Sequence, residues 1–178
     1  GKNDIRKKLI RTVGKAEERF LEDGLRPIRA LRFASQLNFS IEKDTYQEIF
    51  KPHIQKKILS ISLERFRDEF NKMLKSKKPS VGLKLMEETG ILNLFIPEFT
   101  QCRGCVQSDE RGFHDFDVLD HLFYACDGAP SENLIVRLAA LFHDIAKPIV
   151  KNETVKTDDG TEVEHITIYS HENEGAKI

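Results

Sequence analysis

The sequence is poor in the residues that mark non-globular or disulfide-bonded proteins. Its 178 residues include 10 Gly, 6 Pro, 3 Cys and no Trp, which excludes a collagen-like chain, a long disordered tail and a disulfide-stapled mini-protein. No apolar run approaches the roughly 18 residues that span a bilayer, and we find no secretory or transit-type leader. We therefore expect a soluble, cytoplasmic protein with no membrane partner. Because the first residue is Gly1, we also expect a piece of a longer protein.

The few cysteines favour a reducing compartment. Cys102, Cys105 and Cys126 are an odd number, and one Cys-x-x-Cys pair offers two ligands where a structural zinc site needs four. His114 can supply a third ligand, but the nearby sequence offers no fourth. We expect free thiols and keep a zinc site as the alternative.

The near-zero net charge hides two halves of opposite sign. Residues 1–80 carry 20 Lys and Arg against 11 Asp and Glu, whereas residues 81–178 carry 8 against 18 and hold five of the six His residues. A cationic half can gather phosphates, and an anionic, His-rich half suits cation binding. The alternative is that both halves are ordinary solvated surfaces.

Apolar residues at spacings of three and four predict a mainly α protein. One helical face carries Leu63, Phe66, Phe70, Met73 and Leu74, and another carries Tyr46, Ile49, Phe50 and Ile54. A further helix is expected over residues 27–37. Asp44 and Ser62 can cap two helix starts, Pro79 can open a helix and Gly90 can end one. These patterns predict a helical bundle to about Phe99.

Beyond the bundle the pattern changes. Residues 101–112 are polar and aperiodic, which predicts a linker. Residues 134–145 are apolar nearly all round, as in a buried central helix. Alternation from Thr154 to Ile168 around Asp158-Asp159-Gly160 predicts a small β-hairpin, after which Ser170 can cap a last helix.

A carboxylate and a guanidinium lie three residues apart near the start of the bundle. Asp23 and Arg26 can project side by side from a helical turn and present an acceptor next to a donor. Cytosine and adenine share the complementary edge, whereas uracil and guanine reverse it. Arg29 and Arg32 extend a basic stripe that can meet polyphosphate or RNA. The alternative is a surface salt bridge on an amphipathic helix.

A histidine and an aspartate interrupt the apolar segment 138–148. Burying His143 and Asp144 without partners costs free energy, and a divalent cation that both side chains ligate removes that cost. The alternative is a hydrogen-bonded pair in the core. His121 and His171 flank this dipeptide in the sequence. His114-Asp115 is a second His-Asp dipeptide, but its surroundings are not an apolar helix. Lys147 can neutralise a substrate phosphate or simply reach solvent.

The segment from Arg19 to Ala34 resembles the class II bacterial tRNA nucleotidyltransferases, the CCA-adding enzymes and their poly(A) polymerase relatives. The matching pattern is Arg19-Phe20, Glu22-Asp23-x-x-Arg26 and Arg29-x-x-Arg32-Phe33-Ala34. The resemblance implies that Asp23 and Arg26 read the base of incoming CTP or ATP. It also implies that Arg19, Arg29 and Arg32 lie near the nucleotide or the tRNA.

The His and Asp residues around His143-Asp144 resemble the HD-domain metal phosphohydrolases, whose ligands follow the order His, His-Asp, Asp. Here His121 matches the first ligand, His143-Asp144 the namesake pair and His171 an intervening histidine. The resemblance implies a divalent metal, Mg²⁺, Mn²⁺ or Ni²⁺, with phosphate esters as substrates. The last Asp ligand of that family has no obvious match here, so we expect a partial site and weak metal binding.

Together the resemblances imply one architecture, a helical neck followed by a partial HD domain with a small hairpin. Residues 1–15 would be the tail of a catalytic head, 16–100 the neck, 101–112 a linker and 113–178 the partial HD domain. The carboxylates of that head, which hold Mg²⁺ for nucleotidyl transfer, have no counterpart in residues 1–15, so the chain should not polymerise alone. The expected partners are tRNA, CTP, ATP and the missing head.

Two other functions remain open at this stage. One is a free-standing HD phosphohydrolase whose N-terminal helices merely carry charge, and the other is a noncatalytic RNA-binding module. The sequence does not distinguish CCA addition from CC, A or poly(A) addition, and it does not identify the metal, the HD substrate or the oligomeric state.

Overall fold

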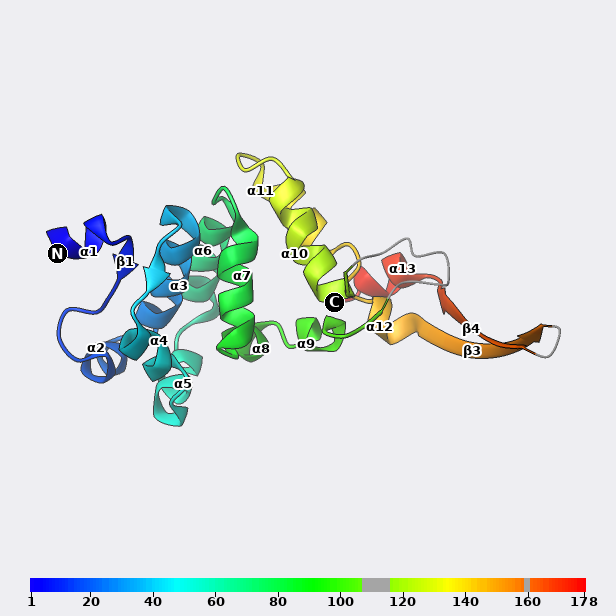
Figure 1. Cartoon of the computed structure of the whole chain (residues 1–178), viewed down its shortest axis with the longest axis horizontal. Coiled ribbons are helices and arrows are strands. Elements are labelled where there is room, and N and C mark those ends of the chain that lie inside the picture. The colour runs from blue at the N-terminus through cyan, green and yellow to red at the C-terminus, as the bar shows by residue number, and fades with distance from the viewer. Residues whose placement is uncertain (107–115, 159–160) are drawn as a thin grey trace.

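The computed structural model describes residues 1–106, 116–158 and 161–178, with only the backbone for residues 153–165. The fold is mainly α, as the periodicity predicts. Figure 1 shows a row of packed helices that leads from the N-terminus to a hairpin at the opposite end. The helices are α1 (Lys2–Arg6), α2 (Ala16–Glu22), α3 (Leu25–Leu37), α4 (Lys43–Ile49), α5 (Pro52–Leu59), α6 (Leu63–Leu74), α7 (Pro79–Glu88), α8 (Ile91–Phe95), α9 (Glu98–Cys102), α10 (Val118–Gly128), α11 (Leu134–Phe142), α12 (Lys147–Val150) and α13 (His171–Gly175).

Most of the predicted helix ends are confirmed. The Ser62 side chain accepts a hydrogen bond from the Arg65 N–H and caps α6. Pro79 is the first residue of α7, and Gly90 adopts a φ of +75° between α7 and α8, a conformation that glycine adopts without strain. The cap of α4 differs from the prediction. Glu42, not Asp44, accepts from the Thr45 N–H, because Asp44 already lies within the first helical turn.

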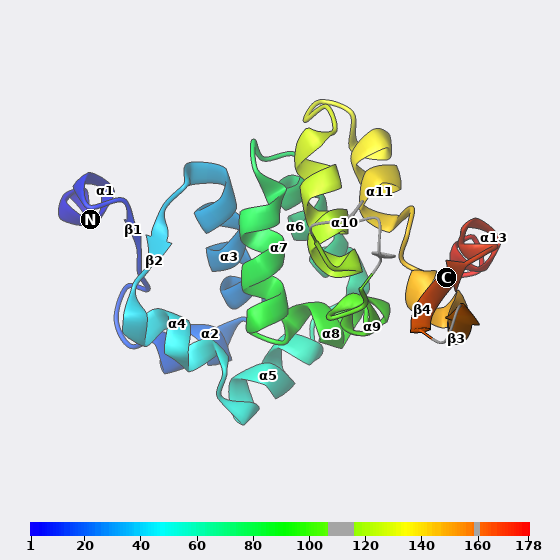
Figure 2. The same ribbon diagram turned by 45° about the vertical axis from the view of Figure 1, so that its right-hand side comes forward.

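Helix α3 lies at the centre of the bundle and packs against α6 and α7 (Figure 2). Its apolar side joins one continuous core with the other helices, in which the Phe66 and Phe95 rings stack with centroids 4.0 Å apart. Cys102 and Cys126 are buried in this core as free thiols. Burial raises the pKa of Cys102 to about 12 and that of Cys126 to about 11.

Polar contacts join α10 and α11 to the bundle. The Asp127 carboxylate accepts hydrogen bonds from the N–H and the hydroxyl of Ser80, at 2.8 and 2.6 Å, in the first turn of α7. Arg137 is only 2% exposed and donates to the backbone carbonyls of Leu74, Ser76 and Ala129. These bonds satisfy carbonyls at the end of α6 that have no helical partner.

Two predictions about residues 134–145 are wrong. Helix α11 ends at Phe142 and is not buried all round, because Ile135 is 79% exposed and Arg137 is among its few buried residues. His143 and Asp144 therefore follow the helix instead of interrupting it. Within the expected linker, Cys102 still belongs to α9, and residues 107–112 lie outside the described residues.

Two small pairs of strands complete the fold. β1 (Leu9–Ile10) pairs in parallel with β2 (Ser40–Ile41), and β3 (Lys151–Asp158) pairs with β4 (Thr161–Ile168) as the expected antiparallel hairpin. The tip of its turn, residues 159–160, lies outside the described residues. Ser170 precedes α13 as expected but adopts a φ of +65° and makes no side-chain cap.

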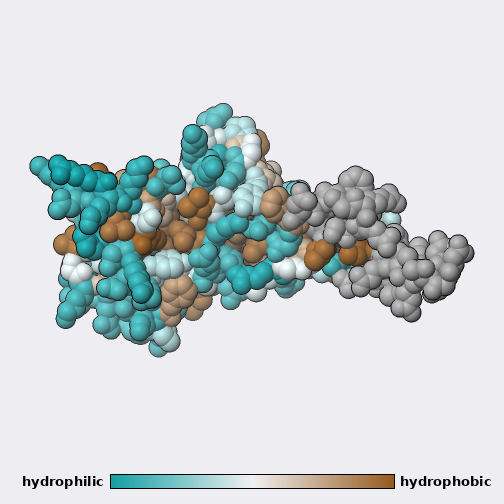
Figure 3. Space-filling model, viewed as in Figure 1, coloured by the Kyte–Doolittle hydropathy of each residue, from teal (hydrophilic) through white to brown (hydrophobic). Residues whose placement is uncertain are grey.

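The face shown in Figure 3 is largely hydrophilic and is interrupted by separate hydrophobic patches. Among the described residues, the helices are too short or too polar to cross a bilayer.

Candidate functional site

Asp23 lies in the turn between α2 and α3, where its carboxylate is held from two sides. Its Oδ1 accepts from the Leu25 N–H at 3.0 Å, and Arg65 Nη2 from α6 contacts Oδ1 and Oδ2 at 3.1 and 2.9 Å. Partial burial opposes ionisation, but these hydrogen bonds and the nearby charges of Arg65 and Arg26 hold the pKa of Asp23 below its usual value. The carboxylate is thus charged and fixed in direction.

Gly24 allows this turn to lie against α5. A Cβ atom at residue 24 would lie 2.3 Å from the carbonyl oxygen of Lys57, closer than any side chain permits. The glycine in Glu22-Asp23-Gly24 therefore reflects a close backbone contact.

Arg26 lies one turn further on and donates its backbone N–H to the Asp23 carbonyl at 3.1 Å, but its guanidinium bonds to other residues. Its Nη1 donates to Glu22 Oε2 at 2.6 Å and to the Arg19 carbonyl at 3.1 Å, and Glu22 also pairs with Arg19 at 2.8 Å. The Arg26 side chain is 41% exposed. The structure thus brings Asp23 and Arg26 to one turn, each held by other residues.

The other two arginines of the predicted basic stripe lie in different surroundings. Arg29 is exposed on α3 beside the Phe33 ring. Arg32 is buried, with its Nε 2.6 Å from Glu69 Oε2, and it lies over the Phe33 ring. Because Arg32 is committed to a buried carboxylate, it is not available to a phosphate in this structure.

The predicted metal ligands converge at the other end of the molecule, near the start of α10 and the segment after α11. His121 Nε2 and His143 Nε2 lie 3.1 Å apart, and they lie 3.3 and 3.0 Å from Asp144 Oδ2. His171 Nε2, from α13, lies 3.1 Å from Asp144 Oδ1. Residues 50 positions apart in the chain thus present imidazole and carboxylate donors to one small volume.

The protonation of this cluster follows from its contacts. Burial raises the pKa of Asp144, but hydrogen bonds from His143 and Lys147 outweigh it and hold this pKa well below its usual range. The hydrogen bond with Asp144 raises the pKa of His143, against the opposing effect of burial. Asp144 is therefore ionised, and its contact with each imidazole fixes the direction of the rings.

Two imidazoles and a carboxylate are donors that suit divalent first-row metals. Their donor atoms lie within 4.8 Å of one another, so the residues present fit one ion. His171 would add a fourth donor from α13.

Several nearby residues have roles that the sequence did not reveal. Lys147 reaches Asp144 Oδ2 at 2.7 Å, an ion pair that neither sequence alternative anticipated. Asp120 pairs with Lys84 of α7 at 2.8 Å. The contact of Arg65 with Asp23 spans 42 residues, and no local spacing reports such a distance. His114 lies outside the described residues.

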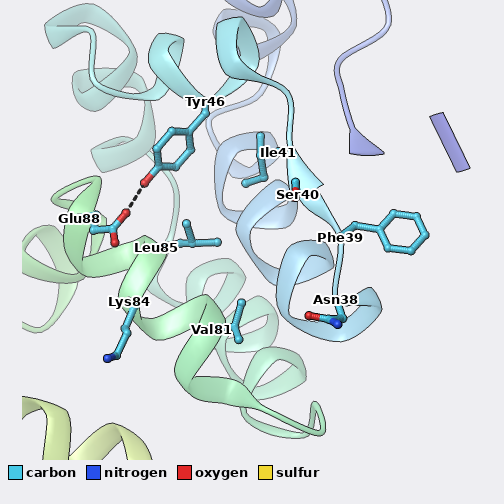
Figure 4. A pocket seen from close by; sticks show the side chains of 9 residues that line it. All are labelled: Asn38, Phe39, Ser40, Ile41, Tyr46, Val81, Lys84, Leu85 and Glu88. Atoms are coloured by element: carbon cyan, nitrogen blue, oxygen red, sulfur yellow. Dashed lines mark hydrogen bonds between the residues drawn. The ribbon is translucent and has the colours of Figure 1, made fainter. Parts of the chain in front are cut away.

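A cleft of about 460 Å³ lies between β2, α4 and α7, and it contains none of the predicted site residues. Figure 4 shows Tyr46 extending across it to Glu88, with a hydrogen bond of 2.7 Å. Burial, and then this carboxylate, raise the pKa of the Tyr46 phenol. The bond joins α4 to α7 across the cleft.

Comparison with known families divides the chain into two matched parts. Residues 38–102 match the family described as "Probable RNA and SrmB- binding site of polymerase A", and residues 112–178 match the HD domain family. An HD domain implies dependence on a divalent metal, in agreement with the donor cluster. The fold and the cluster thus define a helical polymerase-type neck joined to an HD unit.

Proteins similar to this chain in sequence and structure include several tRNA nucleotidyltransferases. The chain is 32% identical over 155 residues to the A-adding tRNA nucleotidyltransferase of Deinococcus radiodurans, covering 83% of this chain and 35% of that protein. It is 46% identical over 126 residues to the CCA-adding enzyme of Bacillus subtilis, covering 70% and 31%. The solved CCA-adding enzyme of Bacillus stearothermophilus in complex with CTP is 30% identical, with a TM-score of 0.54 over 79% of this chain and 39% of that one.

These matches support the interpretation of this chain as the neck and HD part of a tRNA nucleotidyltransferase. The chain spans about a third of the length of these relatives, at 35% and 31%.

Proposed function

We propose that the whole protein adds CCA, or part of it, to the 3′ ends of tRNA from CTP and ATP, and that this chain reads the incoming base. The proposal rests on the turn at Asp23 and Arg26, where an ionised acceptor and an exposed donor are both fixed in a chain similar to a CTP-binding enzyme. We assign residues 16–100 to the neck and 113–178 to the HD unit, in a cytoplasmic enzyme.

The remaining hydrogen-bonding capacity of the pair supports this role. A carboxylate offers about four acceptor positions, and contacts with Leu25 and Arg65 use three of them, which leaves one on Asp23 Oδ2. Arg26 uses Nη1 for Glu22 and Arg19, so its Nε and Nη2 hydrogens can point to a ligand. One acceptor beside one donor matches the edge of cytosine or adenine and mismatches that of uracil or guanine.

The neck also has to approach the phosphates of its substrates. Arg29 is exposed on the same helix as Arg26, and Arg19 is partly exposed on α2, so both are proposed as contacts for nucleotide or tRNA phosphate. Arg32 supports the helix from inside through Glu69. Nucleotidyl transfer itself would use Mg²⁺ held by the carboxylates of a catalytic head, so this chain alone should be inactive in polymerisation.

Substitution in the whole protein tests base reading. Asp23→Ala should weaken the selection of CTP and ATP over UTP and GTP by on the order of 1 to 3 kcal/mol, because the mutant loses a hydrogen bond to the base. The measurement is kcat/KM for each of the four nucleotides with tRNA acceptors. Asp68→Ala, which removes an exposed carboxylate on α6, is the control. Equal discrimination in Asp23→Ala and wild type would disprove the base-reading role.

For the HD unit we propose a divalent-metal phosphohydrolase site, with His121, His143, Asp144 and His171 as ligands of Mg²⁺, Mn²⁺ or Ni²⁺. A bound metal would lower the pKa of a water molecule for attack on a phosphate ester. Asp144 holds His121, His143 and His171 in direction, and Lys147 keeps Asp144 ionised. We expect 2′,3′-cyclic phosphates or 2′-nucleotides as substrates.

His143→Ala separates the two activities. In the whole protein it should abolish hydrolysis of a 2′,3′-cyclic nucleotide with Mn²⁺ or Ni²⁺ and leave CCA addition unchanged. Hydrolysis by this chain without any polymerisation in the whole protein would favour a free-standing phosphohydrolase. Salt-dependent tRNA binding without either activity would favour an RNA-binding module.

A further inference from the structure

We propose that Glu17, Glu48 and His53 form a second divalent-metal site, separate from the HD cluster, that takes Zn²⁺ or an ion of similar preference. The three residues come from three helices of the bundle: α2, α4 and α5. Figure 1 shows these helices towards the N-terminal end, whereas α12 and α13 of the HD unit lie on the other side of α7. The two clusters therefore have no ligand in common.

The donor atoms have the spacing that one ion imposes. His53 Nε2 lies 3.1 Å from Glu17 Oε1 and 3.6 Å from Glu48 Oε1, and all three atoms lie within 4.8 Å of one another. Ligands that each lie about 2.1 Å from a zinc ion are separated by roughly 3 to 3.5 Å. Small rotations of the exposed Glu17 and His53 side chains about the partly buried Glu48 would thus bring the atoms to bonding distance.

The charge of the cluster also calls for a cation. Among the described residues, neither Glu17 nor Glu48 forms an ion pair with a lysine or an arginine, and the imidazole of His53 is the neighbour of both carboxylates. A neutral imidazole, the form that binds metal, leaves the two carboxylates without a balancing charge. A metal ion would satisfy both carboxylates and the imidazole at once.

The surroundings leave room for the remaining ligands. Glu17 and Glu48, though not His53, line a hollow of about 370 Å³. Its wall also contains two acidic residues, Glu42 and Asp44, and two basic ones, Arg11 and Lys15. Water can therefore complete the coordination, and the two additional carboxylates offset the charges of Arg11 and Lys15 in the same wall. One imidazole with two carboxylates is a donor set that zinc accepts, with a water in the fourth position.

Metal at this site would restrain the base-reading turn. Glu17 lies in the first turn of α2, and Asp23 follows directly after the last residue of that helix. An ion shared with α4 and α5 would hold α2 at its start, while Gly24 holds its end against α5. This consequence rests on the proposed function, but metal binding itself does not.

The test is a zinc titration of this chain, prepared without a polyhistidine tag, at pH 8. Calorimetry should show one equivalent fewer in His53→Ala than in the unsubstituted chain. The double variant His53→Ala/His143→Ala should likewise bind one equivalent less than His143→Ala alone, because the two clusters are independent. Glu18→Gln, next to Glu17 on the exposed side of α2, is the matched control and should keep the full stoichiometry.

Thermal unfolding gives a second readout. Saturating Zn²⁺ should raise the Tm of the His143→Ala chain by about 4 °C or more, because a ligand that binds only the folded state stabilises it. Adding Glu17→Gln or His53→Ala to the His143→Ala chain should remove that shift in Tm. Circular dichroism without metal shows whether these variants are folded. If His53→Ala does not fold, Glu17→Gln, an isosteric change at an exposed residue, still tests the proposal. Equal stoichiometry and equal shifts in all variants would overturn the proposal. Its failure would leave base reading and the HD site unaffected.

Discussion

Arg65 shows how a single side chain can determine the state of another one 42 residues away. Its guanidinium directs Asp23 and helps to lower the pKa of that carboxyl. Nothing in the local spacing of Glu22-Asp23-Gly24 reveals this partner. At the residue scale, the identity of the candidate base reader is therefore readable from the sequence, but its support is not.

We expect Arg65→Ala in the whole protein to reduce discrimination between CTP and UTP by on the order of tenfold, because Asp23 would lose its fixed direction. Stability should fall by less than about 1 kcal/mol, since Arg65 is half-exposed. Nucleotide competition assays and urea unfolding measure the two effects. Arg67→Ala, next but one on α6, should alter neither. Unchanged discrimination in Arg65→Ala would show that Asp23 needs no support.

Glu69 is a second residue whose effect should be visible in solution. Burial opposes its ionisation, but Lys72 and Arg32 lower its pKa below the usual 4.5. Because the unfolded chain takes up the proton first, this carboxylate stabilises the fold above about pH 4.5 and loses its effect as the pH falls further.

Glu69→Gln should therefore destabilise the chain at pH 7 by about 3 kcal/mol, because Arg32 would remain buried without its counter-ion. At pH 3 the difference from wild type should shrink. Urea midpoints at both pH values provide the measurement. A constant difference would mean that the Arg32–Glu69 pair contributes nothing through its charge.

At the scale of helices, the turn between α2 and α3 depends on a missing Cβ. Gly24→Ala should force the turn away from Lys57 and cost about 1 to 3 kcal/mol of stability, as overpacking does. It should also weaken nucleotide binding, because Asp23 and Arg26 flank the displaced residue. Thermal unfolding and CTP binding to the whole protein measure these effects. Gly14→Ala is not a suitable control because Gly14 has a φ of +84°. Ala16→Gly, at the first residue of α2, is suitable.

How well each element could be predicted depended on whether its signal was local. α6 and α7 were predictable because their signals are local: Ser62 directly precedes α6, Pro79 opens α7, and the apolar spacing runs along the helix. α11 was not, since its composition gives no sign that Ile135 faces solvent while Arg137 is buried against α6. The convergence of His121, His143 and His171 came from a family resemblance, because contacts over 50 residues leave no periodic trace.

On the scale of the whole molecule, the neck and the HD helices are joined by polar contacts, of which those of Arg137 with Leu74 and Ser76 are buried. Arg137, Asp127 and Lys84 each bond across this junction. We therefore expect calorimetry to show one unfolding transition whose van't Hoff and calorimetric enthalpies agree. Arg137→Met should remove the bonds to Leu74 and Ser76, and split or broaden the transition. Two transitions in the unsubstituted chain would mean that the halves unfold independently.

The charge division leads to a prediction for the whole chain as well. Because most basic residues lie in positions 1–80, tRNA affinity should fall steeply and linearly in log–log form as salt rises. Arg29→Ala should weaken binding at every salt concentration and reduce the slope by roughly 1. Filter binding at several salt concentrations measures both. Lys177→Ala, in the acidic half, serves as the control, and a slope near zero would exclude phosphate contacts.

The enclosed thiols of Cys102 and Cys126 have a practical consequence. Maleimides react with thiolates, and burial makes both the ionised form and access to it rare. A cysteine introduced on the surface should thus accept a fluorescent label while these native ones stay unmodified. Conversely, modification of Cys102 and Cys126 in urea would report the unfolding of the core without any introduced cysteine.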